Sequence, residues 1–217
     1  MRLWLWALMV ALPAALGSGC DAEEVAKSGR VGETTIAINV DPTLIDPVQR
    51  FEPFGVQFSP PAGWAALPQE DVMKVAAAVS GEEPAGQTEV AAGVSEGTEA
   101  SDNYRADPLA VFAKPKSGLW LIVSAVNVPE PAVYTARLRE RHERLDTDQF
   151  LLRGIEVHQY RSFPNGMVNF KLLASAPGRK DERRLQLDYV FPMKEYEKLG
   201  RVLESSIGSL SPSDRTL

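Results

Sequence analysis

The stretch QFLLRGIEVHQYRSFPNGMVNFKLLASAPGRKDERRLQLDYVF, residues 149–191, decides the fold. Its apolar, β-branched and aromatic residues fall in three runs, at 149–163, 167–175 and 183–191, and this composition predicts three strands. The connections between the runs, PNG and APGRKDE, are short enough for antiparallel hairpins. We therefore expect an antiparallel meander in this part of the chain.

Further elements are expected on both sides of the meander. Periodicity and end signals predict a short strand within 54–64, a helix over 67–81, a hairpin over 108–128, and helices over 130–146 and 193–210. The apolar face of the last helix is expected to carry Met193, Tyr196, Leu199, Leu203 and Ile207. This order of elements predicts an α+β fold, in which an antiparallel β-sheet has helices packed on its faces.

The N-terminus, MRLWLWALMVALPAALGSGC, has the layout of a secretory signal peptide. One basic residue, Arg2, precedes an apolar run from Leu3 to Leu16, and small residues follow it. This run is shorter than the roughly 20 residues that a transmembrane helix needs. We expect residues 1–19 to be a signal peptide that is not part of the fold.

Cys20 is the only cysteine in the chain, and the small residues Ser18 and Gly19 precede it. They resemble a bacterial lipobox, whose cysteine becomes the acylated N-terminus of the mature protein, although Gly17 stands where a lipobox usually has leucine. We expect lipid, palmitate included, on Cys20, because two or more acyl chains anchor a protein stably to a membrane. The alternatives are cleavage after Gly17, which leaves a soluble secreted protein, and a retained N-terminal helix.

Downstream of Cys20 the composition predicts a single domain with extensions. We expect a tether over 20–50, the α+β domain over 51–210 and a tail over 211–217. Residues at about 80–107 are rich in Gly, Ala, Ser and Glu, which predicts an acidic flexible insertion. A chain of 217 residues with 44% hydrophobic residues is long enough and apolar enough for one folded core.

Charge and motif content exclude several classes of function. The formal net charge of −6 is poorly suited to a phosphate backbone, so no nucleic-acid partner is expected. A single cysteine excludes an intrachain disulfide and a cysteine-rich zinc site. The sequence has no P-loop, no G-x-G-x-x-G and no G-x-S-x-G, and HERLD lacks the second histidine of H-E-x-x-H. We predict no cofactor, no metal site and no catalytic residue.

Three short segments carry a family resemblance. FGVQFSPPAGW, LQLDYVFP and YEKLGRVLESSIGSL resemble the PsbP-like superfamily, which includes DcrB-like bacterial lipoproteins. The resemblance covers roughly Phe51 to Leu210. It implies an α/β/α sandwich around an antiparallel sheet, and a role in binding or assembly rather than in catalysis. No catalytic residues come with this resemblance.

One polar sheet face is the candidate binding surface. The two-residue period of a strand puts Glu156, His158 and Tyr160 on the same face. Parity permits Lys171 and Asp188, from the next two strands, on that face as well, but the register depends on how many residues close the PNG turn. Such a cluster could hold a metal or act as acid and base. A solvated or helix-covered polar face is the interpretation we favour.

Three hypotheses for function follow. The first is a membrane-anchored bacterial envelope lipoprotein that faces the periplasm or the exterior and acts as a non-catalytic module binding a protein partner or a small ligand. The second is a small metal-dependent or acid/base enzyme that uses His158 with Glu156 or Asp188. The third is a structural envelope protein.

Overall fold

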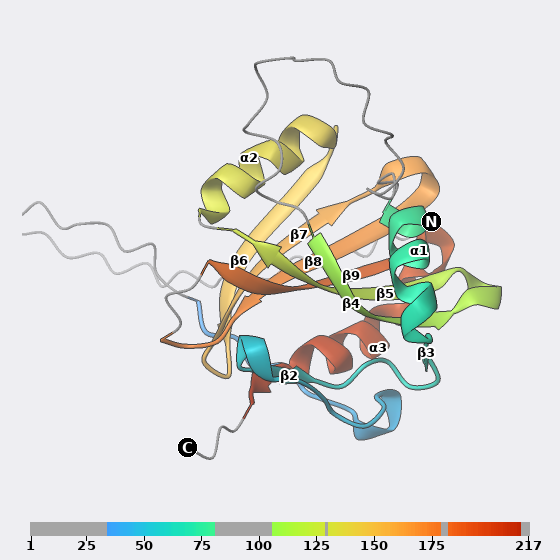
Figure 1. Cartoon of the computed structure of the whole chain (residues 1–217), viewed down its shortest axis with the longest axis horizontal. Helices are drawn as coiled ribbons and strands as arrows, with labels where there is room; N and C mark the ends of the chain where they lie inside the picture. The colour runs from blue at the N-terminus through green and yellow to red at the C-terminus, as the bar shows by residue number, and fades with distance from the viewer. Residues whose placement is uncertain (1–33, 81–105, 129, 179–181, 214–217) are drawn as a thin grey trace, which may run out of the picture. The chain divides into compact units, whose positions relative to one another are not determined.

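The largest element of the fold is an antiparallel sheet of seven strands in the order β3-β4-β5-β9-β8-β7-β6 (Figure 1). The structure is a computed structural model, which describes residues 34–80, 106–128, 130–178 and 182–213. The strands of this sheet are β3 (Ala65–Ala66), β4 (Ala106–Lys114), β5 (Leu119–Asn127), β6 (Leu145–Leu152), β7 (Ile155–Ser162), β8 (Met167–Ser175) and β9 (Arg183–Pro192). The predicted antiparallel sheet is confirmed, and β5 is an interior strand that pairs with β4 and β9.

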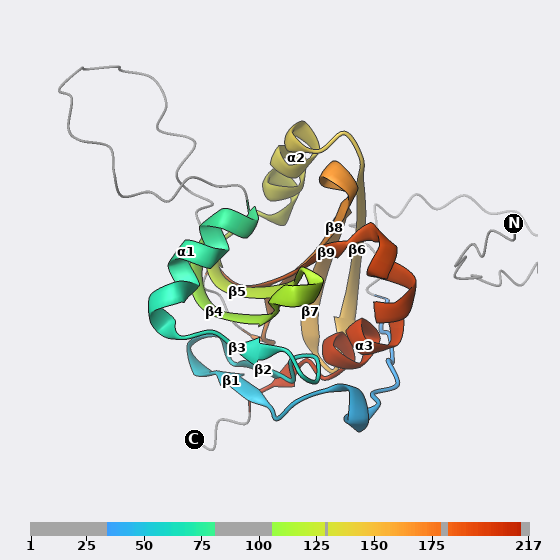
Figure 2. The same cartoon turned by 90° about the vertical axis from the view of Figure 1, so that its right-hand side faces the viewer.

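Helices cover both faces of this sheet (Figure 2). One face carries α1 (Gln69–Ser80) and α2 (Pro131–Arg141), and we call it the α1/α2 face. The other, the α3 face, packs against α3 (Tyr196–Gly208) and a small sheet. That sheet has the order β1-β2-β10 and consists of β1 (Gln49–Phe51), β2 (Val56–Phe58) and β10 (Ser211–Pro212). The predicted α+β class, with helices on the faces of an antiparallel sheet, is confirmed.

The larger core lies on the α3 face. Leu121, Leu172 and Leu187 point to it from neighbouring strands and are fully buried. From α3, Leu199, Leu203 and Ile207 complete it, as the spacing of the last helix predicted. Met193 does not join them: it lies in a 3₁₀ turn (Met193–Glu195) before α3 and is 42% exposed, so that part of the prediction is wrong.

The meander contains one strand more than the sequence predicted. The run 149–163, expected as one strand, is two strands that meet at a two-residue turn, Arg153–Gly154. Both turn residues have positive φ, of 50° and 83°, which is the geometry of a tight hairpin whose twist matches the strands. The prediction failed because Arg-Gly is a weaker turn signal than Asn-Gly.

The helix predicted over 130–146 ends at Arg141. His142 already has extended backbone angles, and Leu145 and Asp146 belong to β6. Leu145 still packs against the hydrophobic cluster to which Tyr134 and Leu138 of α2 belong, so the apolar periodicity spans a helix and a strand. Its contacts are therefore tertiary and not a continuation of the helix.

The packed chain begins earlier and ends later than the predicted domain. Ile36 and Ile38, expected in the tether, pack against the core, and the Asp41 backbone amide donates to Ser205 Oγ at 3.1 Å. Thr35 forms a parallel bridge with Leu151. At the other end, residues 211–212 form β10 rather than a free tail. Residues on both sides of the domain predicted over 51–210 thus pack with it.

Some predictions fall outside the described residues. The signal peptide over 1–19, Cys20 and most of the insertion at about 80–107 are among them. Among the described helices, none is both long enough and apolar enough to cross a membrane.

Candidate functional site

The five residues of the candidate binding surface all lie on the α1/α2 face. Tyr160 pairs with Lys171 across β7 and β8, and Lys171 pairs with Asp188 across β8 and β9. Directly paired residues of an antiparallel sheet project from the same face. Glu156 and His158 precede Tyr160 by four and two residues and share its side of β7. The predicted juxtaposition of these side chains is therefore what the register produces.

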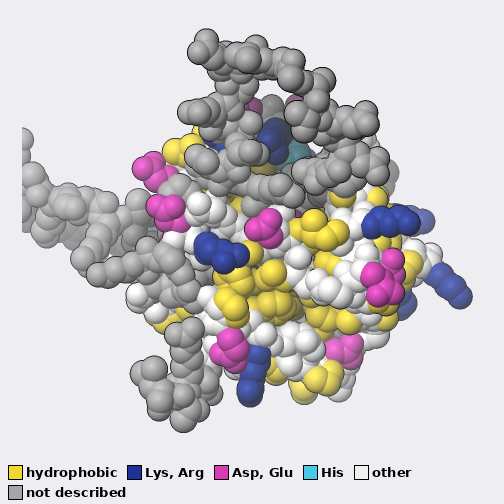
Figure 3. Space-filling view, viewed as in Figure 1, with side chains coloured by type: hydrophobic (Ala, Val, Ile, Leu, Met, Phe, Trp, Pro, Cys, Tyr) yellow, Lys and Arg dark blue, Asp and Glu magenta, His cyan; other side chains and the backbone are white. Residues whose placement is uncertain are grey.

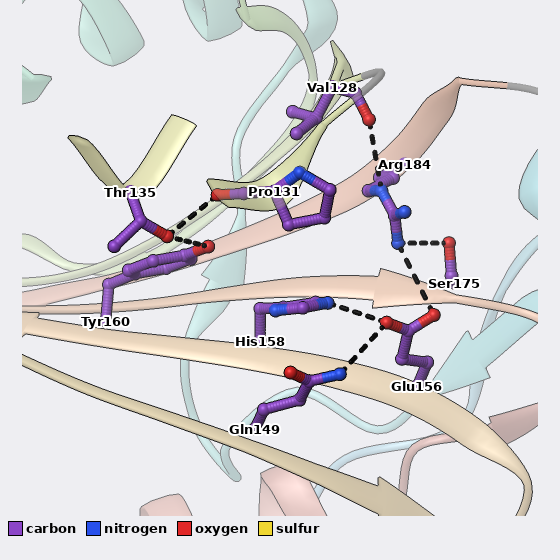
Figure 4. Close-up of polar contacts among 9 residues, drawn as sticks. All are labelled: Val128, Pro131, Thr135, Gln149, Glu156, His158, Tyr160, Ser175 and Arg184. Carbon is purple, nitrogen blue, oxygen red and sulfur yellow. Dashed lines mark hydrogen bonds and ion pairs between the residues drawn. The ribbon is translucent and has the colours of Figure 1, made fainter. Parts of the chain in front are cut away.

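Glu156 is the centre of one group of side chains, shown in Figure 4. His158 Nε2 lies 2.7 Å from Glu156 Oε1, and Gln149 Nε2 donates to the same oxygen at 3.3 Å. Arg184 Nη1 lies 3.9 Å from Oε2. The Glu156 side chain is 38% exposed, whereas that of His158 is 12% exposed. The Glu156 side chain is thus partly exposed, with the more buried His158 beside it and the exposed Gln149 at the edge of the sheet.

Arg184 is held by hydrogen bonds to β8 and to the segment that leads from β5 to α2. Its Nη1 donates to Ser175 Oγ at 2.8 Å, and its Nε donates to the Val128 carbonyl at 3.3 Å (Figure 4). Only 14% of its side chain is exposed. We call Gln149, Glu156, His158, Ser175 and Arg184 the Glu156 cluster. Its charged and polar groups are bonded to one another, which makes it rigid.

Lys171 and Asp188 form a second, separate group beneath α2. Lys171 Nζ lies 3.0 Å from Asp188 Oδ1 and 3.1 Å from Oδ2, and the two side chains are 16% and 8% exposed. Gln186 Nε2 donates to Asp188 Oδ2 at 2.7 Å, and Tyr134 of α2 donates to Gln186 Oε1 at 3.0 Å. We call Tyr134, Lys171, Gln186 and Asp188 the Lys171 cluster. It joins α2 to β8 and β9 through hydrogen bonds and an ion pair.

Tyr160 belongs to the packing between helix and sheet. It is 2% exposed, and its ring meets that of Tyr134 edge-on, with centroids 5.5 Å apart. Its hydroxyl lies 3.2 Å from Thr135 Oγ1, which donates to the Pro131 carbonyl at 2.8 Å (Figure 4). A residue buried to this degree stabilises α2 on the sheet and has little surface to offer a ligand.

The electrostatics of the Glu156 cluster favour a charged carboxylate. The hydrogen bond from His158 lowers the pKa of Glu156, and its burial opposes this shift only in part. The positive charge of Arg184 lowers the same pKa further. Glu156 is therefore an anion at neutral pH, with one oxygen held by His158 and Gln149 and the other facing Arg184 at longer range.

The Lys171 cluster keeps a charged ammonium under a helix. Burial by itself lowers the pKa of Lys171, but the Asp188 carboxylate outweighs this effect, so that the pKa is raised overall. Burial raises the pKa of Tyr134 and of Tyr160. Lys171 is thus a cation at neutral pH, and the two tyrosines are neutral.

The two clusters keep His158 and Asp188 apart. His158 and Asp188 lie on strands separated by β8, about 10 Å apart at the usual strand spacing, and each is bonded to other groups. In the part of the chain that the structure describes, no group of three or more His, Cys, Asp or Glu side chains could hold a metal ion. The predicted combination of His158 with Asp188 is therefore not formed.

Sequence reasoning missed Gln149, Ser175, Arg184 and Tyr134 as members of the two clusters. Arg184 had a usable signal, since it shares strand parity with Gln186 and Asp188 on β9. Gln149 had none, because its position beside His158 depends on the Arg153–Gly154 turn. Tyr134 depends on how α2 packs, which local sequence does not determine.

Comparisons with known proteins add one structural likeness. No family model matches the chain, and no curated protein matches it in sequence. The chain is similar to the solution structure of cyanobacterial PsbP (CyanoP) from Synechocystis sp. PCC 6803, with 11% sequence identity and a TM-score of 0.41, over 85% of this chain and 96% of that one. A likeness of this extent assigns no function to the chain.

Proposed function

We propose that the chain is a membrane-anchored bacterial envelope lipoprotein whose α+β domain is a non-catalytic binding module facing the periplasm or the exterior. Cys20 carries the lipid, and residues 1–19 are its signal peptide. The Glu156 cluster is the surface that contacts a protein partner or a small ligand, through the exposed carboxylate of Glu156.

The hydrogen bonding within the Glu156 cluster is the observation that favours binding over catalysis. A histidine base normally activates a nucleophile that lies within hydrogen-bond reach. Among the described residues, Glu156 is the hydrogen-bond partner of His158, and no serine, threonine, cysteine or lysine side chain bonds to it. A rigid group of bonded polar side chains with one exposed anion is suited to recognition, because little ordering is needed when a partner binds.

Surface charge supports a module for specific contacts rather than general adhesion. Figure 3 shows acidic and basic side chains interspersed over one face of the domain, without a large area of either sign among the described residues. A protein that binds polyanions non-specifically needs a concentrated basic patch. On this face, the charge distribution therefore favours recognition by local geometry over adhesion by overall charge.

The anchor limits where the partner can be. Residues 21–33 lie between Cys20 and the first described residue, and 13 residues span at most about 45 Å when fully extended. The domain thus works within about that distance of the membrane surface, so the partner is another envelope component or a ligand in the envelope.

The anchor is tested by the intact mass of the mature N-terminal peptide, purified from the membrane fraction. A diacylglyceryl-modified peptide beginning at Cys20, absent in Cys20→Ala, is the expected result. A mature chain that begins at Ser18 and is found in the soluble fraction would overturn the anchor and leave a secreted domain with a free thiol.

The enzyme alternative is tested by metal analysis of the purified chain. The His158–Glu156 pair at 2.7 Å is the observation that favours it. Stoichiometric metal in the wild type, lost in His158→Ala but retained in His142→Ala, would support an enzyme and contradict the binding module. We expect no stoichiometric metal in any of the three proteins.

A further inference from the structure

β6 is the last strand of the large sheet, and part of its outer edge has no backbone partner among the residues that the structure describes. The strand order ends at β6, whose one neighbour in the sheet is β7. Thr147, Asp148 and Gln149 are all exposed. An open edge of this kind presents backbone donors and acceptors to which another extended chain can add.

One end of this edge already accepts a strand. The Leu151 amide donates to the Thr34 carbonyl, and the Leu151 carbonyl accepts from the Ile36 amide, each at 3.0 Å. The added segment runs parallel to β6. Because outward and inward backbone groups alternate along a strand, Leu145, Thr147 and Gln149 point their amides and carbonyls outward as Leu151 does. The edge thus presents outward backbone groups at alternate residues from Leu145 to Leu151.

The side chain of Asp148 ends this series of backbone hydrogen bonds at Gln149. The Gln149 amide, next in line after Leu151, donates to Asp148 Oδ1 at 2.8 Å. Asp148 therefore takes the donor that the next carbonyl of the added strand would use. From Leu145 to Thr147, the outward backbone groups have no backbone partner among the described residues.

Asp148 also gives this edge its charge. Asp146 and Asp148 project from the same side of β6, but Asp146 is compensated by Arg161, whose Nη2 lies 3.0 Å away. Asp148 has no ion-pair partner among the described residues. A strand laid along this edge gains most from a basic side chain beside Asp148.

We propose that the edge of β6 from Leu145 to Gln149 receives an extended segment of a partner protein, with a lysine or arginine beside Asp148. The carbonyl of the docked segment replaces Asp148 Oδ1 at the Gln149 amide and frees the carboxylate to pair with that cation. This inference rests on the proposed binding role and names the kind of partner. The surface adjoins the Glu156 cluster, because Gln149 donates to Glu156.

A second copy of the chain fits this edge poorly. Antiparallel pairing of two β6 strands around a two-fold axis at Thr147 sets Asp146 of each copy opposite Asp148 of the other. Like charges directly opposite each other destabilise a strand pair. The acidic side chains therefore disfavour self-association and leave the edge to a basic partner.

The test is amide hydrogen exchange on the purified full chain, with two synthetic peptides as probes. One is acetyl-VKVKVKV-amide, and the control is acetyl-VEVEVEV-amide. We expect the lysine peptide to slow exchange at Thr147 by about tenfold when the edge is mostly occupied, and not at Phe150, whose amide faces β7. We expect binding of the lysine peptide to be about 2- to 5-fold tighter than that of the glutamate peptide.

Charge reversal supplies the matched control. Asp148→Lys is expected to reverse the preference between the peptides, whereas Asp71→Lys, the same change at an exposed site on α1, leaves it unchanged. Three results would each overturn the proposal: no slowing at Thr147 at millimolar peptide, slowing without peptide that rises with protein concentration, and slowing by peptide only after deletion of residues 1–33. The second result would assign the edge to another copy and the third to the chain's own N-terminus. The mass of the Cys20 peptide, which tests the proposed lipid anchor, does not depend on any of these three results.

Discussion

At Gly208, α3 passes so close to the N-terminal segment that no side chain fits between them. A Cβ at this position would lie 2.8 Å from Ile38 Cγ2 and 3.0 Å from Val40 Cγ2. Gly200, in the same helix, has nothing within 4 Å of the equivalent point. The two glycines therefore look alike in sequence but have opposite consequences for stability.

We expect Gly208→Ala to lower the free energy of unfolding by about 1–3 kcal/mol, the usual cost of overpacking a close contact. Gly200→Ala is the matched control and should raise it by about 0.5–1 kcal/mol, because alanine is the better helix former. Urea unfolding followed by circular dichroism measures both. Equal effects of the two substitutions would contradict the close packing of residues 38–40 on α3.

The lowered pKa of Glu156 leads to a second prediction about a single residue. Its pKa in the folded protein lies below the ordinary value of 4.5, so it stabilises the fold at pH values above that value and loses this contribution as the pH falls through the lowered pKa. Glu156→Gln should therefore be less stable than the wild type at pH 7, and the difference should shrink below about pH 4.5.

The measurement is urea unfolding at a series of pH values from 3 to 7. Glu140→Gln, at an exposed site on α2, is the control for loss of one negative charge. A stability difference for Glu156→Gln that does not change between pH 7 and pH 3 would show that His158 and Arg184 do not stabilise the carboxylate.

At the scale of elements, the β6–β7 hairpin depends on a turn with an unfavourable residue. Arg153 has a φ of 50°, in the left-handed region that costs an ordinary L-residue roughly 1–2 kcal/mol. Gly154, with a φ of 83°, carries no such cost. The turn fixes the register in which Gln149 faces His158, so the hairpin positions the Glu156 cluster.

We expect Arg153→Asn to raise the free energy of unfolding by about 0.5–1 kcal/mol, because asparagine tolerates this conformation better than arginine. Arg153→Val should lower it, since β-branched residues are disfavoured there. Thermal unfolding measures both changes. Destabilisation by asparagine would mean that the arginine side chain contributes more than its backbone costs.

At the scale of the whole molecule, the N-terminal segment belongs to the folded domain. Residues 34–40 bridge to β6 through Leu151 and pack Ile36 and Ile38 against the core. They also cover Gly208. Residues 34–40, which composition assigned to a tether, therefore pack with the domain that was predicted to begin at 51.

Deletion of residues 1–40 should lower the free energy of unfolding by about 2–4 kcal/mol relative to deletion of residues 1–33, because two partly buried isoleucines are lost. In the longer deletion, Gly208→Ala should no longer be destabilising, since its contacts with Ile38 and Val40 are gone. Urea unfolding of the four proteins measures this coupling. Additive effects of deletion and substitution would place the segment elsewhere.

Local patterns determined much of this architecture by themselves. Period-two alternation and turn residues gave the antiparallel strands, and helical periodicity gave α1 and the apolar stripe of α3. The shared face of Glu156, His158 and Tyr160 also followed from alternation within one strand. These features depend on neighbouring residues alone, so sequence is sufficient for them.

Tertiary structure decided the rest. Pairing between β5 and β9 sets the strand order, and the Arg153–Gly154 turn sets the register of β6. Register across β7, β8 and β9 joined Asp188 to Lys171 and left His158 to Glu156. The same packing placed Ile36 and Ile38, which composition had assigned to the tether, against the core. Such contacts join residues far apart in the chain, and their free energy comes from burial and pairing across elements that no local pattern records.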